Sequence, residues 1–387
     1  MTFREQLVYN YQKQADFAST YSPLYAQLFG KVSEWLKDEA HPVTAWLVEA
    51  GKERNPFEMT LLLVAGLHEA VLSNHPAAIE LAAFYPTVGG SKSPEDPTLH
   101  TILESAILNM RPHLTHVIQT ANVQTNETGR GSSWLLPVAF TPWPQVELLD
   151  LGASAGLNLI ADQSRFEFFH DDQSILTLGE GDQTSLEVSV RGLYEPLKKL
   201  SVKTPQVKSR RGTDLMPFHL NVEADGQRLK SYVWGDQPTR LARLDRALTN
   251  YQTVQESDVP IQLAAVHLPF ELETYLESLP PSDTPLVIYN TIVTMYFPND
   301  RPQLEETVAN WASQQRRPVL WMQWEPRASW MEETRSEEEF GWAGWTADFW
   351  QHGSHHQFLL GWVQPHGLQV RLTDGLQQWA DYWQQSA

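Results

Sequence analysis

Asp150 stands at the end of an apolar run, and a glycine-rich turn follows it directly. The segment is Val146–Leu159 (VELLDLGASAGLNL), in which Gly152 and Gly156 follow Asp150 at the spacing D-x-G-x-x-x-G. The pattern predicts a buried strand that turns tightly into a helix, because glycine allows unusual backbone angles and lets a ligand come close. Backbone N–H groups of this turn can bind a carboxylate, and Asp150 can attract a positive charge. The loop lacks the G-x-G-x-x-G spacing of dinucleotide-binding folds.

A second carboxylate, Asp214, ends the next predicted strand, Gln206–Asp214 (QVKSRRGTD). A carboxylate at such a strand end can accept hydrogen bonds from both vicinal hydroxyls of a ribose. With Ala153 and Ser154 in the turn, this set favours S-adenosylmethionine, which carries a cationic sulfonium, an amino-acid tail and a ribose. A second interpretation stays open: Asp214 can simply be a turn or helix-cap residue before Pro217.

Two regions of different pattern must position these residues. Residues 1–140 predict an all-α N-terminal domain, with helical spacing over Phe3–Ser19, Phe57–Leu72 and Thr98–Met110. This domain can cap the site. Proline residues that suit a linker follow or end this region, namely Pro137, Pro142 and Pro144.

Residues 141–387 predict an α/β domain with a mostly parallel sheet, because short apolar runs alternate with helical segments. The runs are Val146–Leu151, Ile261–His267, Leu286–Tyr289 and Pro318–Trp324, and the helical segments include Gln237–Tyr251 and Arg301–Gln315. Alternating runs at about 163–205 interrupt this rhythm and predict inserted antiparallel hairpins.

The motifs of the two carboxylates resemble those of a known enzyme class. Asp150–Gly156 and Gly212–Pro217 look like the first two motifs of class I S-adenosylmethionine-dependent methyltransferases. More closely, the chain resembles a bacterial family known only as a domain of unknown function. The matching segments are Ser22–Tyr25, Phe84–Pro86 with Gly89-Gly90, Gln124–Arg130 (QTNETGR) and Gly152–Asn158 (GASAGLN). The resemblance implies a class I methyltransferase-like (Rossmann-like) fold and an S-adenosylmethionine cofactor; it implies a fold more than an activity.

Polar residues at the later strand ends are the candidates for catalysis. His267 stands where such enzymes usually carry a polar or acidic residue near the adenine, and a partly buried structural histidine is the alternative. We expect the transferred methyl group near Asn290, Thr291 and Tyr296, since ligands gather at strand ends of open α/β sheets. Turn capping is the alternative for Asn290. If the acceptor is a hydroxyl or an amine, His267, Glu127 and Glu325 are the candidate bases.

Within QTNETGR, Asn126, Glu127 and Arg130 place an amide, a carboxylate and a guanidinium just before the α/β domain. A loop of this kind can cover the cofactor, or bind the carboxylate of an acceptor through Arg130. The other interpretation is a surface turn in which Glu127 pairs with Arg130.

Two rival chemistries use other residues. Gly152–Gly156 also fits G-x-S-x-G, the serine-hydrolase elbow, and Asp348 and His366 follow Ser154 in the order Ser…Asp…His. His352, His355 and His356 (HGSHH) can ligate a metal, although a solvated loop is the stronger interpretation and we predict no metal site. A fold that has lost catalysis and binds a ligand is the third class.

The composition and charge of the chain limit the classes of molecule that it can bind. The 387 residues carry 28 Lys and Arg against 47 Asp and Glu, a formal net charge of −19. Such a field repels nucleic acid and anionic lipid, which leaves a small molecule or a basic partner open. Of these we expect a small-molecule substrate. The chain has no cysteine, which removes thiolate nucleophiles. With neither a signal-peptide pattern nor a membrane-length apolar run, a cytoplasmic protein is expected. The sequence leaves the oligomeric state and the methyl acceptor open.

Overall fold

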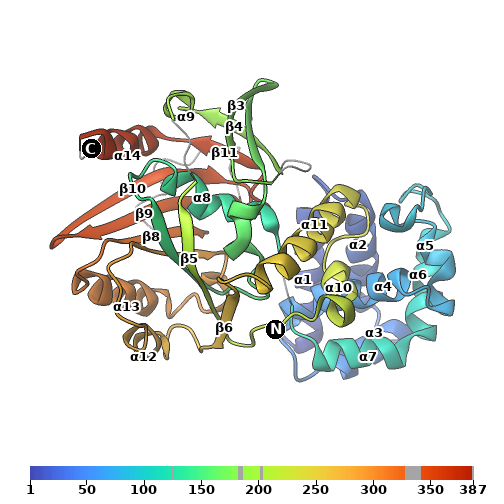
Figure 1. Ribbon diagram of the computed structural model, residues 1–387. Coiled ribbons are helices and arrows are strands. Elements are labelled where there is room, and N and C mark those ends of the chain that lie inside the picture. The colour runs from blue at the N-terminus through green and yellow to red at the C-terminus, as the bar shows by residue number, and fades with distance from the viewer. Residues whose placement is uncertain (124–125, 182–185, 201–203, 327–340, 386–387) are drawn as a thin grey trace. The chain divides into compact units, whose positions relative to one another are not determined.

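The computed structural model describes residues 1–123, 126–181, 186–200, 204–326 and 341–385, which form two compact units (Figure 1). A helical unit comprises Met1–Thr125 and Asn221–Asp245, and an α/β unit comprises Asn126–Leu220 and Arg246–Ala387. The boundary at residue 140 and the capping role stay predictions. The two units divide after residue 125, and a later segment of the chain joins the first unit.

The described part of the helical unit contains no strand, as the sequence predicts. Proline in the first turn starts several of its helices, and the Asn55 side chain caps α4 by accepting from the Phe57 N–H. The helices are α1 (Phe3–Ala18), α2 (Pro23–Lys37), α3 (Pro42–Gly51), α4 (Pro56–Leu72), α5 (Ile79–Ala82), α6 (Leu99–Asn109), α7 (Arg111–Thr120) and α10 (Val222–Ser231), and α11 (Pro238–Gln255) begins here. α4 is buried on most of its faces, as its apolar composition predicts.

An aromatic stack fixes the returning segment 221–245 in the helical unit. The Trp234 ring lies between Tyr21 and Tyr25, with centroid distances of 5.2 and 4.7 Å and interplanar angles of 7°. The Gly235 N–H donates to the Tyr25 hydroxyl, and the Ser22 hydroxyl donates to Asp236. The Ser22–Tyr25 motif therefore holds this segment in place, which is a structural role.

The described residues of the α/β unit form one sheet of eleven strands. Its order is β3-β2-β4-β11-β10-β9-β8-β7-β1-β5-β6, and six of its ten strand pairs are parallel. The strands are β1 (Gln145–Leu151), β2 (Phe166–His170), β3 (Gln173–Leu178), β4 (Leu186–Gly192), β5 (Gln206–Asp214), β6 (Ile261–Ala265), β7 (Leu286–Thr291), β8 (Val319–Glu325), β9 (Ala343–Gln351), β10 (Ser354–Val363) and β11 (Gln369–Leu372). The predicted α/β class with a mostly parallel sheet is confirmed.

The parallel core has a point at which the chain changes direction across the sheet. In the order β6-β5-β1-β7-β8, the chain runs from β1 outward to β5 and β6, then returns to the other side of β1 as β7. This is the 3-2-1-4-5 order of doubly wound folds, whose ligands bind beyond the carboxyl ends of the strands at that switch point. The carboxyl ends of β1 and β7 are therefore the expected ligand position.

The predicted insertion differs in part from the expectation. β2 and β3 form an antiparallel hairpin, as predicted. β4, however, pairs parallel with both β2 and β11, so the interpretation of the whole insertion as antiparallel hairpins is wrong. A local alternating pattern predicts a strand but does not determine its partners, and here one of the two partners, β11, lies far along the chain.

Helices cover both faces of the sheet. α12 (Leu272–Glu277) and α13 (Arg301–Ser313) pack on one face, and α8 (Ser132–Val138) and α14 (Asp374–Gln385) on the other (Figure 1). Pro137 is buried inside α8 and accepts a hydrogen bond from the Trp379 indole, so its assignment to a linker is wrong. Trp379 and Trp383 of α14 are buried against Phe349 of the sheet, where they form part of the core.

Among the described residues, no single helix combines the length and the apolar composition needed to cross a bilayer. One helix pair, α4 with Pro76–Ala82, passes that test only jointly and is bent by 105°.

Candidate functional site

The turn after β1 has the strained geometry that its glycines suggested. Gly152, Ser154 and Gly156 have φ angles of +94°, +52° and +79°. The N–H groups of Gly152 and Ala153 donate to the Thr213 carbonyl over 2.8 and 2.9 Å, which fastens the turn to β5. A serine at positive φ is uncommon, because the conformation is strained and persists only where the surrounding structure holds it. Strained backbone of this kind is frequent at functional sites.

Asp150 and Asp214 are near neighbours at this edge. Asp150 is 2 % exposed and pairs in register with Gly212 of β5 and Tyr289 of β7. Burial raises the pKa of Asp150 to about 8, with a further rise from Asp214, while the Tyr289 hydroxyl and the Arg130 guanidinium lower it. The Asp150 carboxyl group is therefore mostly protonated at neutral pH, and a bound cation would favour its ionised form.

Asp214 connects the two strand ends through its partly exposed carboxylate. Its Oδ2 accepts from the Ser154 N–H over 2.9 Å, and its Oδ1 accepts from the Met216 N–H over 3.0 Å. A carboxylate has about four acceptor positions. Asp214 thus fulfils the turn-forming role that the sequence left open and keeps acceptor capacity for a ligand.

Asn126 lies directly on the glycine turn. Its Nδ2 donates to the Ser154 hydroxyl over 3.1 Å, and its Oδ1 accepts from the Ala155 N–H over 3.4 Å. An N–H of the turn thus already faces an oxygen acceptor, as it would face a ligand carboxylate. Gln124 and Thr125 of the same motif lie outside the described residues.

Glu127 and Arg130 reach other parts of this edge. Glu127 is buried, accepts from the Gly129 N–H and lies 3.5 Å from Nδ1 of His366. Arg130 is also buried, and it donates to the Pro365 carbonyl over 2.9 Å and to the Thr291 carbonyl over 3.4 Å. Both therefore belong to the interior of the α/β unit and not to an exposed surface turn.

Glu325 organises the turn after β7. Its carboxylate accepts from the Asn290 amide (2.7 Å), the Val293 N–H (2.9 Å), and both the N–H (3.1 Å) and the hydroxyl (2.6 Å) of Thr294. Burial raises the pKa of Glu325, and these donors oppose the rise. Within this turn Ile292 has φ +56°, a genuine outlier for a β-branched residue. The turns after β1 and β7, on the two sides of the switch point, thus both contain strained backbone.

Asn290 is fully buried and has partners on both sides of its amide. Besides donating to Glu325, it accepts from the Trp321 indole N–H over 2.7 Å. This is the capping role that the sequence left open, so Asn290 positions the β7 turn. Thr291 ends β7 next to it.

The remaining predicted residues stand on exposed loops. Tyr296 ends the short 3₁₀ helix Thr294–Tyr296 and is 52 % exposed. His267 is exposed as well; its N–H donates to Glu271, and its ring meets Phe270 edge-on at 5.0 Å. His267 is therefore accessible to a ligand and is not a partly buried structural histidine.

Exposed apolar side chains also stand in the loops after three of these strands, and the sequence pattern singled out only Tyr296 among them. They follow β5, β6 and β7 and are between 42 % and 62 % exposed: Leu215, Met216, Phe270, Met295 and Tyr296. Exposed apolar groups mark binding surfaces where they form a contiguous patch. The sequence feature that could have identified these residues is their position, since each follows a polar residue at or near the end of a predicted strand.

Asp348 and His366, the acid and the base of the proposed serine-hydrolase triad, pair with residues other than those that chain order suggested. Asp348 accepts from His355 (2.9 Å) and Gln357 (3.1 Å), whereas His366 lies beside Glu127. The hydrogen bonds of Asp348 that are described here thus do not lead to His366. Within the described part of the chain, no three His, Asp or Glu side chains gather as a metal site.

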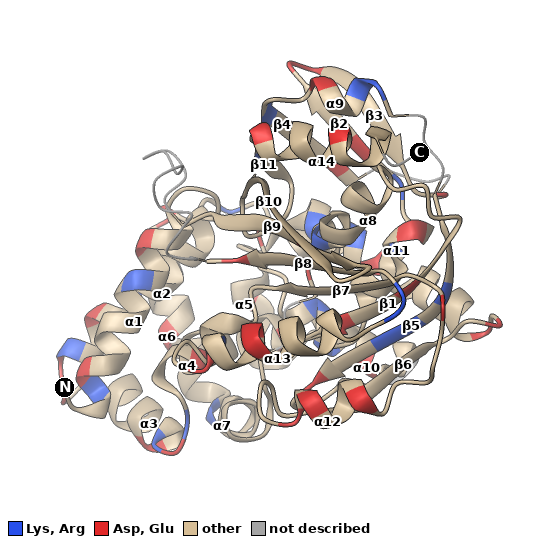
Figure 2. Cartoon of the chain, turned by 90° about the vertical axis from the view of Figure 1, so that its left-hand side faces the viewer, with Lys and Arg blue, Asp and Glu red and all other residues tan. Residues whose placement is uncertain are grey.

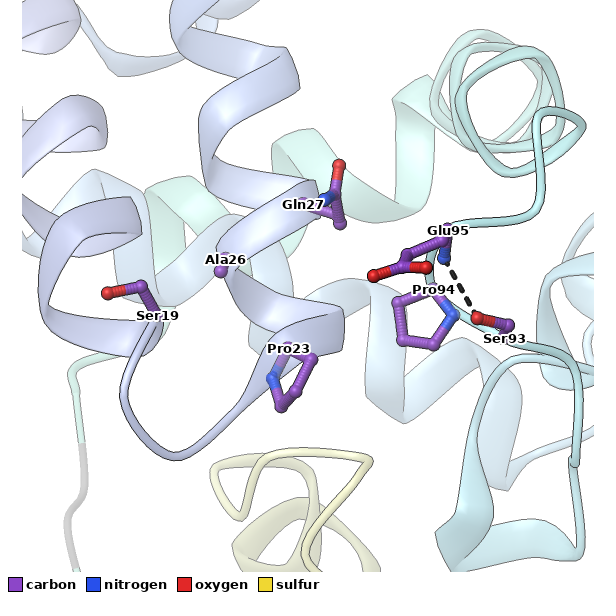
Figure 3. Close-up of a pocket in the computed structure, with 7 residues that line it drawn as sticks. All are labelled: Ser19, Pro23, Ala26, Gln27, Ser93, Pro94 and Glu95. Carbon is purple, nitrogen blue, oxygen red and sulfur yellow. Dashed lines mark hydrogen bonds between the residues drawn. The ribbon is translucent and has the colours of Figure 1, made fainter.

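The described part of the chain also has hollows away from these strand ends. One, of about 460 Å³, is in the helical unit between the start of α2 and the Ser93–Glu95 turn (Figure 3). Its lining holds one carboxylate, Glu95, whose N–H donates to the Ser93 hydroxyl. The other, of about 200 Å³, lies in the α/β unit beneath α13.

The sequence profile of one protein family, described as an uncharacterized protein conserved in bacteria (DUF2332), matches residues 9–371. The chain belongs to this family. The match covers both units and includes the Ser22–Tyr25, Gln124–Arg130 and Gly152–Asn158 segments. Among curated proteins and solved structures, none is similar enough to match the chain.

Proposed function

We propose that this DUF2332 protein is an S-adenosylmethionine-dependent methyltransferase that acts on a small-molecule acceptor, built on a class I methyltransferase-like fold. The observation that carries the proposal is the bond between the Ser154 N–H and the Asp214 carboxylate at the switch point. It places a glycine turn and a carboxylate with spare acceptor capacity at neighbouring strand ends, where doubly wound folds bind nucleosides.

The residues present fit such a cofactor. Asp214 would accept from the ribose hydroxyls, and the N–H groups of the turn near Ala155 would meet the amino-acid carboxylate, in the position now taken by the Asn126 oxygen. Leu215 and Met216 offer exposed apolar surface beside Asp214 for the adenine. S-adenosylmethionine supplies an electrophilic methyl group on a positively charged sulfur.

The chain's own part is mainly to position the reactants and to exclude water. The Asp150 carboxyl group would ionise beside the bound cation, because a nearby positive charge lowers a carboxyl pKa. Asn290 and Glu325 hold the β7 turn, on which Thr291, Met295 and Tyr296 would meet the acceptor. Of the three candidate bases, Glu325 is unsuited because four hydrogen bonds occupy its buried carboxylate; Glu127 and His267 remain.

The test is isothermal titration of the full chain with S-adenosylhomocysteine. We expect binding that Asp214→Asn weakens at least about tenfold, since a hydrogen bond to a charged group contributes about 1.5–3 kcal/mol. Asp258→Asn, at an exposed carboxylate, is the matched control and should bind normally. Absence of binding to the unmodified chain would refute the proposal. Binding without methyl transfer to any acceptor would favour a non-catalytic binding protein.

The serine hydrolase remains a second candidate because of one observation. Ser154 has φ +52° inside G-x-S-x-G, the strained conformation of a nucleophile elbow, and the Ala155 N–H faces an oxygen as an oxyanion-hole donor would. A base for Ser154 would have to be His366 with Glu127, in place of the Asp348 that chain order suggested. Labelling by a fluorophosphonate probe that Ser154→Ala abolishes would favour this alternative.

A further inference from the structure

The hollow of about 200 Å³ in the α/β unit lies under α13, and we call it the α13 pocket. It measures about 200 Å³, roughly the volume of seven liquid waters. Alternate residues of β8, β9 and β10 form its floor, including Trp321, Gln323, Asp348 and Trp350. His355, whose side chain is 46 % exposed, marks its connection to solvent.

The polarity of this floor is unusual for a sheet face that a helix covers. The same face is apolar under the rest of α13 and α12, where Leu149, Ile288 and Val319 pack against Leu304 and Val308. In the α13 pocket, polar side chains replace them. Burying polar groups is costly unless they find partners, so a polar face beneath a helix calls for a ligand or water.

Two acceptor groups in the α13 pocket have unused capacity. Gln323 is 6 % exposed, and its Oε1 is fully buried with no hydrogen-bond partner among the described residues. Asp348 is 5 % exposed, and both of its hydrogen bonds, from His355 and Gln357, end on the single oxygen Oδ1. A ligand that satisfies this pocket must therefore donate hydrogen bonds.

Charge and aromatic surface define that donor further. Two carboxylates line the pocket. Glu305 pairs with the guanidinium of Arg301 at 2.8 Å, whereas Asp348 pairs with His355, which is charged only when protonated. Figure 2 shows further acidic residues along α12 and α13. The Trp321 and Trp350 side chains line the cavity, and indole faces attract cations; one face of Trp350 is stacked on the His355 ring at 4.5 Å.

We propose that the α13 pocket binds a small organic amine in its ammonium form, with its N–H groups donating to Gln323 and Asp348 and its apolar part between the tryptophans. This site is independent of the proposed methyl transfer, since none of its acceptors belongs to the glycine turn. One contact links the two regions: the Trp321 indole that lines the pocket donates to Asn290.

The experiment compares two probes of one shape, benzylamine and benzyl alcohol, by saturation-transfer NMR titration of the full chain. We expect benzylamine to bind at least about tenfold more tightly, because only its ammonium group pairs with a buried carboxylate. Asp348→Asn should weaken benzylamine about tenfold and leave benzyl alcohol unchanged. Gln323→Leu removes an acceptor that serves both probes, so it should weaken benzylamine about tenfold and weaken benzyl alcohol as well. Asp171→Asn, at an exposed carboxylate, is the matched control.

Since Asp348 is buried, its variant can fail to fold, and urea unfolding of each variant checks this. Glu305→Gln serves as a reserve, because its side chain is 43 % exposed and tolerates substitution. It should weaken benzylamine by removing negative charge from the wall. Equal binding of both probes, no binding of benzylamine, or unchanged affinity in folded Gln323→Leu would each overturn the proposal. Loss of S-adenosylhomocysteine binding has no bearing on any of these readouts.

Discussion

The backbone N–H of Ser154 donates to Oδ2 of Asp214 over 2.9 Å, joining two residues that are 60 positions apart in the chain. The Phe218 N–H, just beyond Asp214, donates in turn to the Ser154 carbonyl over 3.1 Å. These two hydrogen bonds connect the turn after β1 with the loop after β5, so each segment stabilises the conformation of the other. A ligand that uses one of them contacts a structure already set by the other, which reduces the ordering cost of binding.

Substitution of Gly152 tests whether the glycine turn must pack against the β7 turn. A Cβ at Gly152 would lie 2.6 Å from Cγ2 of Val293, in addition to adopting φ +94°. We expect Gly152→Ala to lower the free energy of unfolding by roughly 2–5 kcal/mol, the sum of backbone strain and overpacking. Urea denaturation of the full chain measures it.

Gly353 provides the control for this substitution. It also has positive φ, +77°, but its added Cβ would meet nothing within 4 Å. Gly353→Ala should therefore lower stability by only about 1–2 kcal/mol, the strain alone. Equal losses for the two variants would contradict the packing explanation.

The raised pKa of Asp150 predicts a pH-dependent stability. The folded state keeps the Asp150 proton up to a pKa of about 8, whereas the unfolded chain releases it near the ordinary value of 3.8. Between these values the folded state binds more protons, so stability falls as pH rises. Asp150→Asn should remove this loss, on the order of a few kcal/mol. Urea unfolding at pH 5 and pH 8.5 checks it; an equal pH dependence in both proteins would contradict the burial argument.

The same proton predicts a signature of cofactor binding. If the sulfonium cation binds beside Asp150, the carboxyl group ionises and releases up to one proton near pH 7. Titrations with S-adenosylmethionine in two buffers of different ionisation enthalpy would then give different apparent heats. Asp150→Asn should abolish the difference. A buffer-independent heat for the unmodified chain would show that no cation reaches Asp150.

Glu325→Gln should destabilise the β7 turn. The Gln side chain has one acceptor oxygen where four hydrogen bonds end in the native protein, and its NH₂ group would face donors. We expect a loss of about 3 kcal/mol or more in the free energy of unfolding. Glu306→Gln, an exposed carboxylate on α13, should change stability by less than about 0.5 kcal/mol. Similar effects in both variants would argue against the network.

The buried pair of Arg210 and Asp162 predicts a non-additive result. The guanidinium donates to both carboxylate oxygens over 2.7 and 2.6 Å, and both side chains are nearly inaccessible. Asp162→Ala alone should cost roughly 3–5 kcal/mol, because it leaves a buried charge unpaired. The double variant Asp162→Leu with Arg210→Met should cost less than that single change. Additive losses in a double-mutant cycle would contradict this expectation.

The local pattern of the sequence predicted much of the fold. The apolar run before Asp150 and the spacing of Gly152 and Gly156 predicted a strand, a tight turn and a following helix, and β1, the strained turn and the 3₁₀ helix Leu157–Gln163 confirm these. Helical spacing likewise predicted α1 and α4 within a residue or two at their ends. These features depend on backbone sterics and side-chain periodicity within a few neighbouring residues.

The predictions from sequence were wrong where a contact with a residue far along the chain determines the structure. Pro137 carries an ordinary linker signal, yet α8 buries it against Trp379. β4 alternates like a hairpin strand, but it pairs parallel with β11. Asp348 precedes His366 in a suggestive order, while the sheet register brings it to His355 instead. No local pattern contains this information.

By itself, therefore, the sequence determined the elements and their types, and it placed Asp150 and Asp214 at strand ends, because strand and turn preferences act over a few residues. Only the tertiary structure decided what each polar group meets: Ser154 for Asp214, Glu325 for Asn290, and no described partner for the oxygen of Gln323. The physical reason is that sheet order and register bring distant residues together, and burial then sets their hydrogen bonds and their pKa values.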